Sequence, residues 1–525
     1  MKTEHPKREI APDNQISIAF LWRAAEFCEQ DGRACLIMPS KGLLFNRSNP
    51  HRVFRKEFFA RYNIKTVINF SVIRHALFSK AVDPATAIIY APSEPDDTKP
   101  ILYCTPKPAH SLVDKWQFVI DSQDIAMLPR SETREDDVIW KVAMWGGPRD
   151  YALIKRLMSP AYTTLGQICK DRQWVNGEGV IVGKEAQRKN DASWLVGKPY
   201  VEAKSLNRFA VNEAALPLFE ISKLQRPRPD QKAIFSGPHV LLKQSPLTGE
   251  SGFRAALLLG DAVFRHSLIG INGPVHDLDL LVECCIALNS RVPLYFAMMS
   301  SRRWLVERDE LEEAEVMTLP MPKDRSNQPV TVGTLRALSQ DPDWESKVAA
   351  LTEGLFGLTR DEQILVDDAI NFTLDFFRWK GNSKAVKPTF SQTEGDRLLK
   401  EYLDVMIYTL EGSFGKPFTT TIFEHGDSPL RVVAVKLSET GESGIPRITI
   451  EGSQPALDLA LQKADEFLKE RRLPNVFIQR NVRAYIGKTI YVVKPDQQRY
   501  WTRASALRDA DEIYVDIMQA WRPSL

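Results

Sequence analysis

The sequence predicts a mixed α/β protein that opens with an α/β sheet and continues into two α+β domains. Near the N-terminus, three short apolar runs have turn residues beside them, at 34–38, 66–70 and 86–90. Such runs are typical of strands buried on both faces of a sheet. Between the first two runs, segment 53–59 holds four apolar residues at helical spacing. This order of strand, helix and strand predicts one unit of an α/β sheet.

A further helix is expected before this unit. Asp13 is of a residue type that caps helices, and apolar residues follow it at intervals of three and four: Ile16, Phe20, Ala24 and Phe27. The chain therefore opens in the middle of an α/β pattern.

The composition is that of a protein with several globular domains. At 525 residues the chain is long enough for about three domains, which we place at 1–160, 161–325 and 326–525. Hydrophobic residues make up 43% and charged residues 26%, as in soluble proteins. A net charge of +2 leaves DNA binding open, because that depends on local clusters of charge. The polar N-terminus and the lack of a membrane-spanning apolar run predict a cytoplasmic protein without a membrane partner.

Several kinds of catalytic site find no support in the sequence. The six cysteines include no Cys-x-x-Cys pair and no histidine lies at ligand spacing, which predicts reduced thiols and no metal. Segment 427–436 has the outline of a nuclease site, but Ala434 stands where an acid is expected. No Ser-His-Asp motif or phosphate-binding loop occurs. Enzymatic activity of this chain alone is therefore not expected.

One N-terminal stretch carries a family resemblance. It is Cys-Leu-Ile-Met-Pro-Ser-Lys-Gly-Leu-Leu-Phe-Asn at 35–46, followed by Leu-Phe at 77–78 before the third apolar run. The stretch resembles the second half of the catalytic domain of N6-adenine DNA methyltransferases of Type I and Type IIG restriction-modification systems. The resemblance implies a partial Rossmann-like methyltransferase sheet, with Ser40 to Asn46 lining the catalytic cleft. It also implies that Phe78 stacks on a flipped adenine; the alternative is a core aromatic residue.

Two motifs of that family are absent from these 525 residues. They are the glycine-rich loop that holds S-adenosylmethionine and the Asn-Pro-Pro-aromatic motif that grips the adenine. Asn49-Pro50 lacks the second proline, and Gly177-Glu-Gly179 follows no strand that opens a helix. The resemblance therefore implies that S-adenosylmethionine is bound mainly by a partner chain carrying the N-terminal methyltransferase half. Without a partner the first strand would have an unpaired edge.

The middle of the chain predicts a second domain, which starts near 164–169 and ends near 319–322. Its candidate strands are 177–183, 240–244 and 267–271, and a helix is expected at 278–289. The order of Asn289-Ser290, Ser300-Ser-Arg-Arg-Trp304 and Leu319-Pro-Met-Pro322 resembles the TaqI-like target recognition domain of the same enzymes. The resemblance implies double-stranded DNA as a partner, read through its grooves.

Basic residues of this domain are candidates for DNA contact. They are Lys184, Arg188, Lys189, Lys198, Lys204, Arg208, Arg226, Arg228, Lys243, Arg302 and Arg303. Arg226 and Arg228 lie in Gln-Arg-Pro-Arg-Pro, whose prolines stiffen the backbone. The alternative is an ordinary solvated surface.

The C-terminal part predicts a third domain. Helices are expected at 351–380, 394–410 and 455–471, strands at 418–423, 430–437 and 447–451, and a hairpin turns at 486–488. The tail then mixes basic and aromatic residues. Arg480, Arg483, Arg499 and Arg503 are its candidates for DNA contact. The alternative is that the aromatic residues form a core and the basic residues are merely exposed.

The leading hypothesis is the DNA-recognition and partial catalytic subunit of a split N6-adenine DNA methyltransferase, in a restriction-modification or antiphage system. One alternative is a non-enzymatic DNA-binding protein derived from such a methyltransferase. Another is a fragment of a longer gene.

Overall fold

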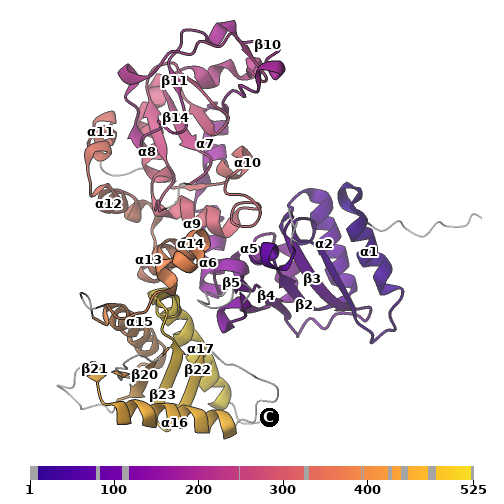
Figure 1. Ribbon diagram of the computed structural model, residues 1–525, viewed down its shortest axis with the longest axis vertical. Helices are drawn as coiled ribbons and strands as arrows, with labels where there is room; N and C mark the ends of the chain where they lie inside the picture. The colour runs from indigo at the N-terminus through magenta and orange to yellow at the C-terminus, as the bar shows by residue number, and fades with distance from the viewer. Residues whose placement is uncertain are drawn as a thin grey trace, which may run out of the picture. The chain divides into compact units, whose positions relative to one another are not determined.

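The computed structural model describes residues 10–78, 83–108, 118–246, 249–323, 330–391, 393, 395–423, 429–438, 447–470 and 481–521. Two compact units are present: Met1–Asp137 with Asp367–Leu525, and Val138–Val366. Mixed α/β structure with several sheets occurs throughout (Figure 1).

The N-terminal sheet of the first unit has the strand order β1-β3-β2-β4-β7. Its strands are β1 (Ala34–Pro39), β2 (Asn63–Asn69), β3 (Ala85–Ala91), β4 (Ile101–Cys104) and β7 (Ile125–Leu128). Strand β3 is antiparallel to both β1 and β2, so β1 and β2 run parallel to each other with β3 between them. Helix α2 (Asn49–Arg61) connects β1 to β2, which confirms the predicted strand–helix–strand unit.

Aromatic packing holds α1 (Ile16–Ala25) and α2 on one face of this sheet (Figure 1). The Trp22 ring lies 4.9 Å from the Phe58 ring, which in turn lies 5.2 Å from the Tyr90 ring of β3. The Tyr90 hydroxyl donates a hydrogen bond to the Leu21 carbonyl at 2.5 Å. Edge-to-face rings of this kind add stability beyond the area that they bury.

The predicted helix is present as α1, but the apolar residues whose spacing predicted it do not form its buried face. Ile16, Phe20 and Phe27 are 72%, 59% and 78% exposed. The helix instead buries a second stripe, made of Ile18, Leu21, Trp22 and Ala25. This stripe contains Trp22, whose large ring packs among the aromatic residues of α2. Asp13 also does not cap α1, because the residue before its first turn is Gln15.

One prediction about the strands of this sheet is also wrong. Strand β1 is not buried on both faces, since it lies at the edge of the described sheet with Cys35 and Ile37 exposed. Strand β4 lies inside the sheet, between β2 and β7.

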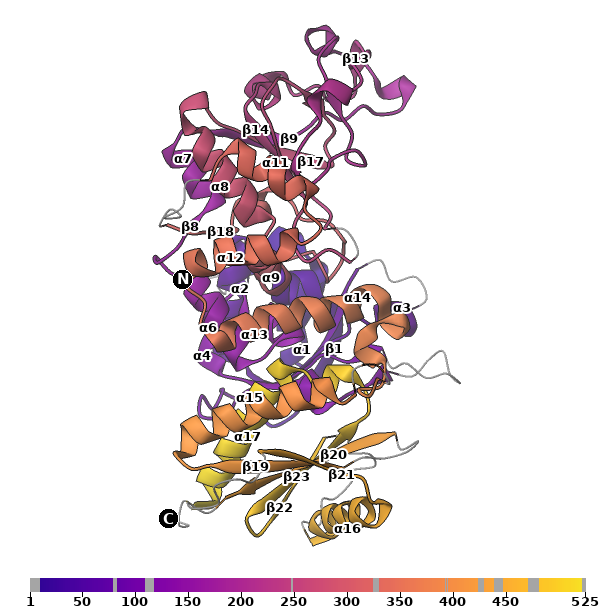
Figure 2. The same ribbon diagram turned by 90° about the vertical axis from the view of Figure 1, so that its left-hand side faces the viewer.

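The C-terminal part of the first unit contains a second five-stranded sheet, with the order β21-β19-β20-β23-β22. Its strands are β19 (Phe418–Phe423), β20 (Leu430–Leu437), β21 (Ile448–Glu451), β22 (Val482–Ile486) and β23 (Thr489–Pro495). Figure 2 shows α15 (Arg397–Phe414) and α17 (Arg503–Trp521) on one face and α16 (Gln454–Glu470) on the other. The predicted strands and the hairpin at 486–488 are confirmed. The single helix predicted at 351–380 is wrong, because Gly357 has φ +53 and separates α12 (Trp344–Phe356) from α13 (Arg360–Asp368).

The second unit is built around a sheet of order β12-β15-β14-β17-β9. Its strands are β9 (Val175–Glu178), β12 (Phe209–Ala210), β14 (His239–Lys243), β15 (Ala255–Leu258) and β17 (Leu268–Asn272). Its helices include α7 (Leu165–Asp171), α8 (Leu278–Leu288), α9 (Arg291–Ser300) and α11 (Val332–Gln340). Strands β14 and β17 and helix α8 match the predicted elements within one residue at each end.

A short pair of strands joins the start and the end of this sheet region. Strand β8 (Thr163–Thr164) is antiparallel to β18 (Pro320–Met321). The Leu165 amide also donates to the Leu319 carbonyl at 3.0 Å. The chain therefore enters and leaves this region at one place.

Candidate nucleic-acid interface

Two segments far apart in the sequence form one basic surface in the second unit. We call residues 181–191 and 223–228 the basic ribbon. Ile181 and Arg226 exchange backbone hydrogen bonds at 3.0 Å in both directions. Strand β10 (Asn190–Asp191) pairs with β13 (Lys223–Leu224), and the Asn190 amide donates to the Gln225 carbonyl at 2.7 Å. These contacts bring Lys184, Arg188 and Lys189 to the same surface as Lys223 and Arg226, which sequence reasoning could not join.

Apolar side chains fix the ribbon to the core of its unit. Val182 and Leu224 are buried and belong to one cluster with Ile234, Phe235 and Phe264. Because alternate residues of an extended chain point to opposite sides, Lys223 and Gln225, the neighbours of Leu224, point away from this cluster. These two side chains are therefore displayed on a backbone that the core holds in place.

The ribbon carries an excess of positive charge. Its two segments contain six cations, Lys184, Arg188, Lys189, Lys223, Arg226 and Arg228, against two carboxylates, Glu185 and Asp191. Lys184, Lys189, Lys223 and Arg226 are exposed. Arg228 differs, since its guanidinium bonds Glu178 at 2.6 Å and is only 12% exposed. The exposed cations and the amides of Asn190 and Gln225 suit the phosphates and base edges of nucleic acid.

Other predicted contacts of this unit lie elsewhere and are engaged within the fold. Lys198 bonds Asp261 at 2.7 Å, and Lys204 bonds Glu202 at 2.7 Å. Arg208 is 11% exposed, bonds the Asn289 side chain at 2.8 Å and lies 4.2 Å over the Trp344 ring. Lys243 is half-buried, and burial, with Arg254 nearby, lowers the pKa of its amine. The structure does not bring these four residues together with the ribbon in any contact described.

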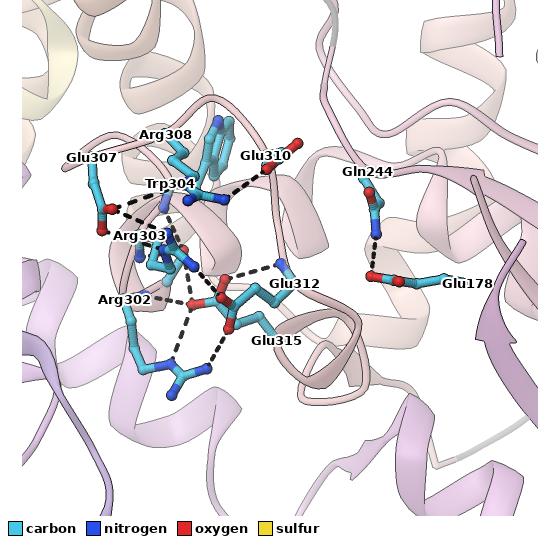
Figure 3. A network of polar contacts seen from close by, with 11 residues as sticks. Glu178, Gln244, Arg302, Arg303, Trp304, Glu307, Arg308, Glu310, Glu312 and Glu315 are labelled. Carbon is cyan, nitrogen blue, oxygen red and sulfur yellow. Dashed lines mark hydrogen bonds and ion pairs between the residues drawn. The ribbon is translucent and has the colours of Figure 1, made fainter. Parts of the chain in front are cut away.

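Arg302 and Arg303 belong to a dense network of charges (Figure 3). Arg302 bonds Glu312 at 2.8 Å, while its backbone amide donates to Glu315 at 2.6 Å. Arg303 bonds Glu312 at 2.5 Å and Glu307 at 3.0 Å, so it lies between two carboxylates. Burial lowers the pKa of Arg303, but the hydrogen bonds that its guanidinium donates to Glu312 and Glu307 outweigh this and raise the pKa overall. The network folds the Ser-Ser-Arg-Arg-Trp stretch into a rigid loop and leaves little uncompensated charge for phosphates.

An open groove of the same unit went unnoticed in the sequence. Its volume is about 820 Å³, and its polar lining includes Asn207, Asn212, Arg254, Arg336 and Gln340. Arg336 is exposed, whereas Arg254 bonds Glu250. These residues come from three separate stretches without a shared motif. No signal in the sequence could have joined them.

The basic and aromatic tail forms structural contacts within the first unit. Arg483 bonds Glu512 and lies 3.5 Å from Asp516, and these acids raise its pKa. Arg503 bonds Asp368 at 2.9 Å. The Arg499 guanidinium lies 3.6 Å from Asp121 and 4.9 Å from the centre of the Phe376 ring. These contacts favour the alternative in which the tail is part of a core; Arg480 lies outside the described residues.

Ser40 lies at the end of β1 within a buried cluster of polar side chains. Its hydroxyl oxygen lies 2.5 Å from the Thr86 hydroxyl oxygen and 3.3 Å from the Ser71 hydroxyl oxygen. Ser71 also donates to Asn69 at 2.5 Å, and the Asn69 amide donates to the Tyr103 hydroxyl at 2.8 Å. The ends of β1, β2 and β3 thus meet through hydroxyl and amide groups that are fully buried.

Asn46 and Phe78 have different surroundings. The Asn46 side chain accepts from the Ser48 amide at 3.0 Å, and its backbone carbonyl accepts from Arg55 at 2.7 Å. It therefore orients the turn before α2. Phe78 is half-buried and directly follows the short helix α3 (Arg74–Leu77). Stacking of Phe78 on a base stays a prediction.

Comparison with known proteins gives one family match. Residues 3–75 match a family described as Eco57I restriction-modification methylase. The N-terminal segment of this chain, from α1 to the start of α3, is thus related to methylases of restriction-modification systems. No curated protein sequence matches the chain.

Solved structures that are similar to this chain come from restriction-modification systems. The Type IIL enzyme MmeI in complex with DNA is 9% identical with a TM-score of 0.31, over 69% of this chain and 52% of MmeI. The HsdS subunit from Thermoanaerobacter tengcongensis is 11% identical with a TM-score of 0.16, over 52% of this chain and 65% of HsdS. A Type I restriction-modification assembly gives 14% identity and a TM-score of 0.20, over 50% and 64% of the two chains. The present chain spans about half of MmeI.

In the described part of the chain, no single helix is long and apolar enough to cross a membrane. The helices Val275–Leu288 and Arg291–Ser300 reach that length and apolarity only when taken together, and they are bent by 63° relative to each other. Within the same residues, no group of three or more His, Cys, Asp and Glu side chains could hold a metal ion.

Proposed function

We propose that this chain is the DNA-recognition and partial catalytic subunit of an N6-adenine DNA methyltransferase of the restriction-modification kind. The basic ribbon of the second unit carries the proposal, because it displays exposed cations and amides on a backbone anchored in a core. The methylase match at residues 3–75 supports the choice of enzyme class. In this function the second unit binds double-stranded DNA, and the N-terminal sheet contributes one part of the methyl-transfer site.

The described residues around Ser40 do not fit a complete site for S-adenosylmethionine. The cluster is fully buried, and the Ser40 hydroxyl lies within hydrogen-bond distance of the Thr86 and Ser71 hydroxyls. Such a cluster supports neighbouring strand ends but offers no open cradle for a charged cofactor. The methyl donor is accordingly bound mainly by a second polypeptide, which also supplies the Asn-Pro-Pro motif.

DNA binding is tested by fluorescence anisotropy over a series of salt concentrations. The ribbon variant K184A/K189A/K223A removes three exposed lysines, so the slope of log affinity against log salt should fall by about 2.7. The control K170A/K400A/K416A removes three exposed lysines of other surfaces and should keep the slope. Equal losses in both variants, or no binding by the unchanged chain, would contradict the proposal.

Catalysis is tested by transfer of a labelled methyl group from S-adenosylmethionine to unmethylated DNA. We expect incorporation only when the chain is mixed with the polypeptide from the neighbouring reading frame. Incorporation by the chain alone would overturn the need for a partner. If DNA binding is intact but neither sample methylates, the protein is instead a non-enzymatic specificity factor.

A further inference from the structure

One loop of the first unit presents aromatic rings and lysines together. It begins at the last residue of α14 (Asp375–Trp379), and we call residues 379–390 the aromatic loop. Trp379 and Phe390, at its two ends, are 48% and 52% exposed. Between the two rings lie three exposed lysines, Lys380, Lys384 and Lys387. The loop itself contains no carboxylate, so these charges have no acidic neighbour along it.

Two carboxylates outside the loop hold its backbone. Asp375 accepts hydrogen bonds from the Ser383 hydroxyl at 2.5 Å and from the Lys384 amide at 3.0 Å. Asp496 accepts from the amide and the hydroxyl of Thr389, at 2.9 and 2.7 Å. Ser383 and Thr389 are themselves buried, at 1% and 4% exposed. The rings and lysines are therefore presented on a backbone that is already in place, which lowers the entropy cost of binding a ligand.

The same two carboxylates leave the lysine charges uncompensated. Their printed partners in the loop are backbone amides and hydroxyls, not ammonium groups. In the part of the chain that the structure describes, no carboxylate forms an ion pair with any of the three lysines of the loop. The Lys384 ammonium lies instead 5.3 Å from the centre of the Phe372 ring. The loop thus displays three positive charges to solvent.

The positive charge of the loop reaches a second segment of the first unit. His75 lies in α3 and is exposed. Burial, then Arg74 and then Lys380 lower the pKa of its ring. Lys380 is therefore close to α3, although about three hundred residues separate the two in the sequence. An anion bound along the loop would meet positive charge from both segments.

Exposed aromatic rings beside lysines suit a nucleic acid whose bases are unpaired. The face of an unpaired base stacks on an aromatic ring, while the flanking phosphates attract ammonium groups. In a duplex the base faces are already stacked on each other, so they offer nothing to these rings. A lipid membrane fits less well, because burying the turn at Gly381 and the exposed Asn382 in hydrocarbon would remove water from polar backbone groups.

We propose that the aromatic loop binds single-stranded nucleic acid. Trp379 and Phe390 stack on bases, and the three lysines contact phosphates. This site is distinct from the basic ribbon, which belongs to the second unit and to duplex DNA. It goes beyond the proposed function, because neither methyl transfer nor recognition of a duplex requires it.

The test measures fluorescence anisotropy of the full chain with a labelled oligothymidine of about 12 nucleotides, and separately with duplex DNA. Trp379→Ala/Phe390→Ala should weaken binding of the single strand about tenfold or more and leave duplex affinity unchanged. The matched control Phe20→Ala/Phe27→Ala removes two rings of the same unit that are 59% and 78% exposed, and it should change neither affinity. The ribbon variant K184A/K189A/K223A should keep its affinity for the single strand.

Single substitutions at Trp379 separate stacking from general apolar contact. Trp379→Phe keeps an aromatic face and should keep most of the affinity. Trp379→Leu keeps an apolar side chain without a flat face and should lose as much affinity as Trp379→Ala. The variant K380A/K384A/K387A should lower the slope of log affinity against log salt by about 2 for the single strand. An oligouridine of the same length shows whether DNA or RNA binds more tightly.

Cross-linking of the unsubstituted chain provides a reading that needs no variant. Irradiated single strands that contain bromouracil should become attached to Trp379 or Phe390, as located by mass spectrometry. Equal losses of single-strand and duplex affinity in Trp379→Ala/Phe390→Ala, or full affinity in Trp379→Leu, would overturn the proposal. It would also be overturned if the two rings were needed for binding vesicles of phosphatidylcholine and phosphatidylserine but not for binding oligothymidine. Failure of the unsubstituted chain to bind a duplex would contradict the proposed function without affecting this site.

Discussion

Gly183 lies so close to Gln225 that a Cβ atom at Gly183 would come within 2.6 Å of the Gln225 Cβ. Gly183 also has φ +71, in the left-handed region that side chains disfavour. The close approach joins the two segments of the basic ribbon. Only glycine satisfies both conditions at this position.

Gly183→Ala should therefore destabilise the second unit and weaken DNA binding. The left-handed backbone costs about 1–2 kcal/mol with alanine, and the contact with Gln225 adds to this cost. Urea unfolding measures the stability and anisotropy measures the binding.

Gly197→Ala is the matched control for this prediction. Gly197 has φ +84, but a Cβ there meets nothing within 4 Å. It should show the backbone cost alone, with DNA binding kept. Equal effects of the two substitutions would mean that the contact with Gln225 is unimportant.

Arg303→Ala should destabilise the loop of Figure 3 by about 1–3 kcal/mol, because Glu307 and Glu312 lose a shared, 15% exposed partner. Arg308 is 53% exposed and bonds Glu310 at 3.3 Å, so Arg308→Ala should change stability by about 0.5 kcal/mol or less. Thermal unfolding of both variants gives the comparison. A smaller loss with Arg303 than with Arg308 would show that the network does not hold the loop.

Acid should weaken the second unit through His239. This residue is fully buried in β14, its Nδ1 lies 2.9 Å from the Ile234 carbonyl, and burial lowers the pKa of the ring below the ordinary 6.5. The unfolded chain then takes up a proton that the folded unit resists. Stability from this group is present above pH 6.5 and is lost as the pH falls below it, by at most about 1.4 kcal/mol per pH unit.

His239→Gln should flatten this acid dependence, measured as the urea midpoint between pH 7 and pH 5. His266 is exposed, and His266→Gln should leave the dependence as it is. An unchanged pH profile in His239→Gln would assign the acid sensitivity to other groups.

The C-terminal sheet depends on a buried charge pair. Lys494 and Asp509 are 1% and 3% exposed and bond each other, while Tyr402 donates to Asp509 at 2.8 Å. Lys494→Met should cost about 3 kcal/mol, because it leaves the buried Asp509 with only the more distant Arg483 guanidinium, at 3.8 Å, as a cation. The double variant Lys494→Met/Asp509→Asn should lose less than Lys494→Met alone. If the losses in free energy of unfolding caused by Lys494→Met and by Asp509→Asn simply add up in the double variant, as measured by chemical unfolding, the two residues are not a coupled pair.

The first helix explains one limit of prediction from sequence. Segment 16–27 contains two apolar stripes on opposite sides of a helix, and periodicity fits both of them. The stripe that contains Trp22 is the buried one, because the aromatic residues of α2 and Tyr90 surround it. Those neighbours are remote in sequence or belong to another element. Strands β1, β2, β3, β14 and β17 were predicted within a few residues, whereas β7 and β15 were not predicted.

The basic residues show a second limit. Arg228 forms an ion pair with Glu178, and Arg483 forms one with Glu512, only in the folded chain. Sequence reasoning therefore treated paired and free cations alike. Arg302 and Arg303 were more accessible to prediction, since Glu307, Glu312 and Glu315 follow within a few residues and could have suggested a local network. Joining Lys184 to Lys223 required the backbone pairing of the ribbon.

The pairing of β8 with β18 bears on how such proteins diversify. Strands β8 (Thr163–Thr164) and β18 (Pro320–Met321) lie side by side, so the stretch between them begins and ends at one place in the structure. Recombination could exchange the whole stretch, basic ribbon included, without stretching the chain on either side.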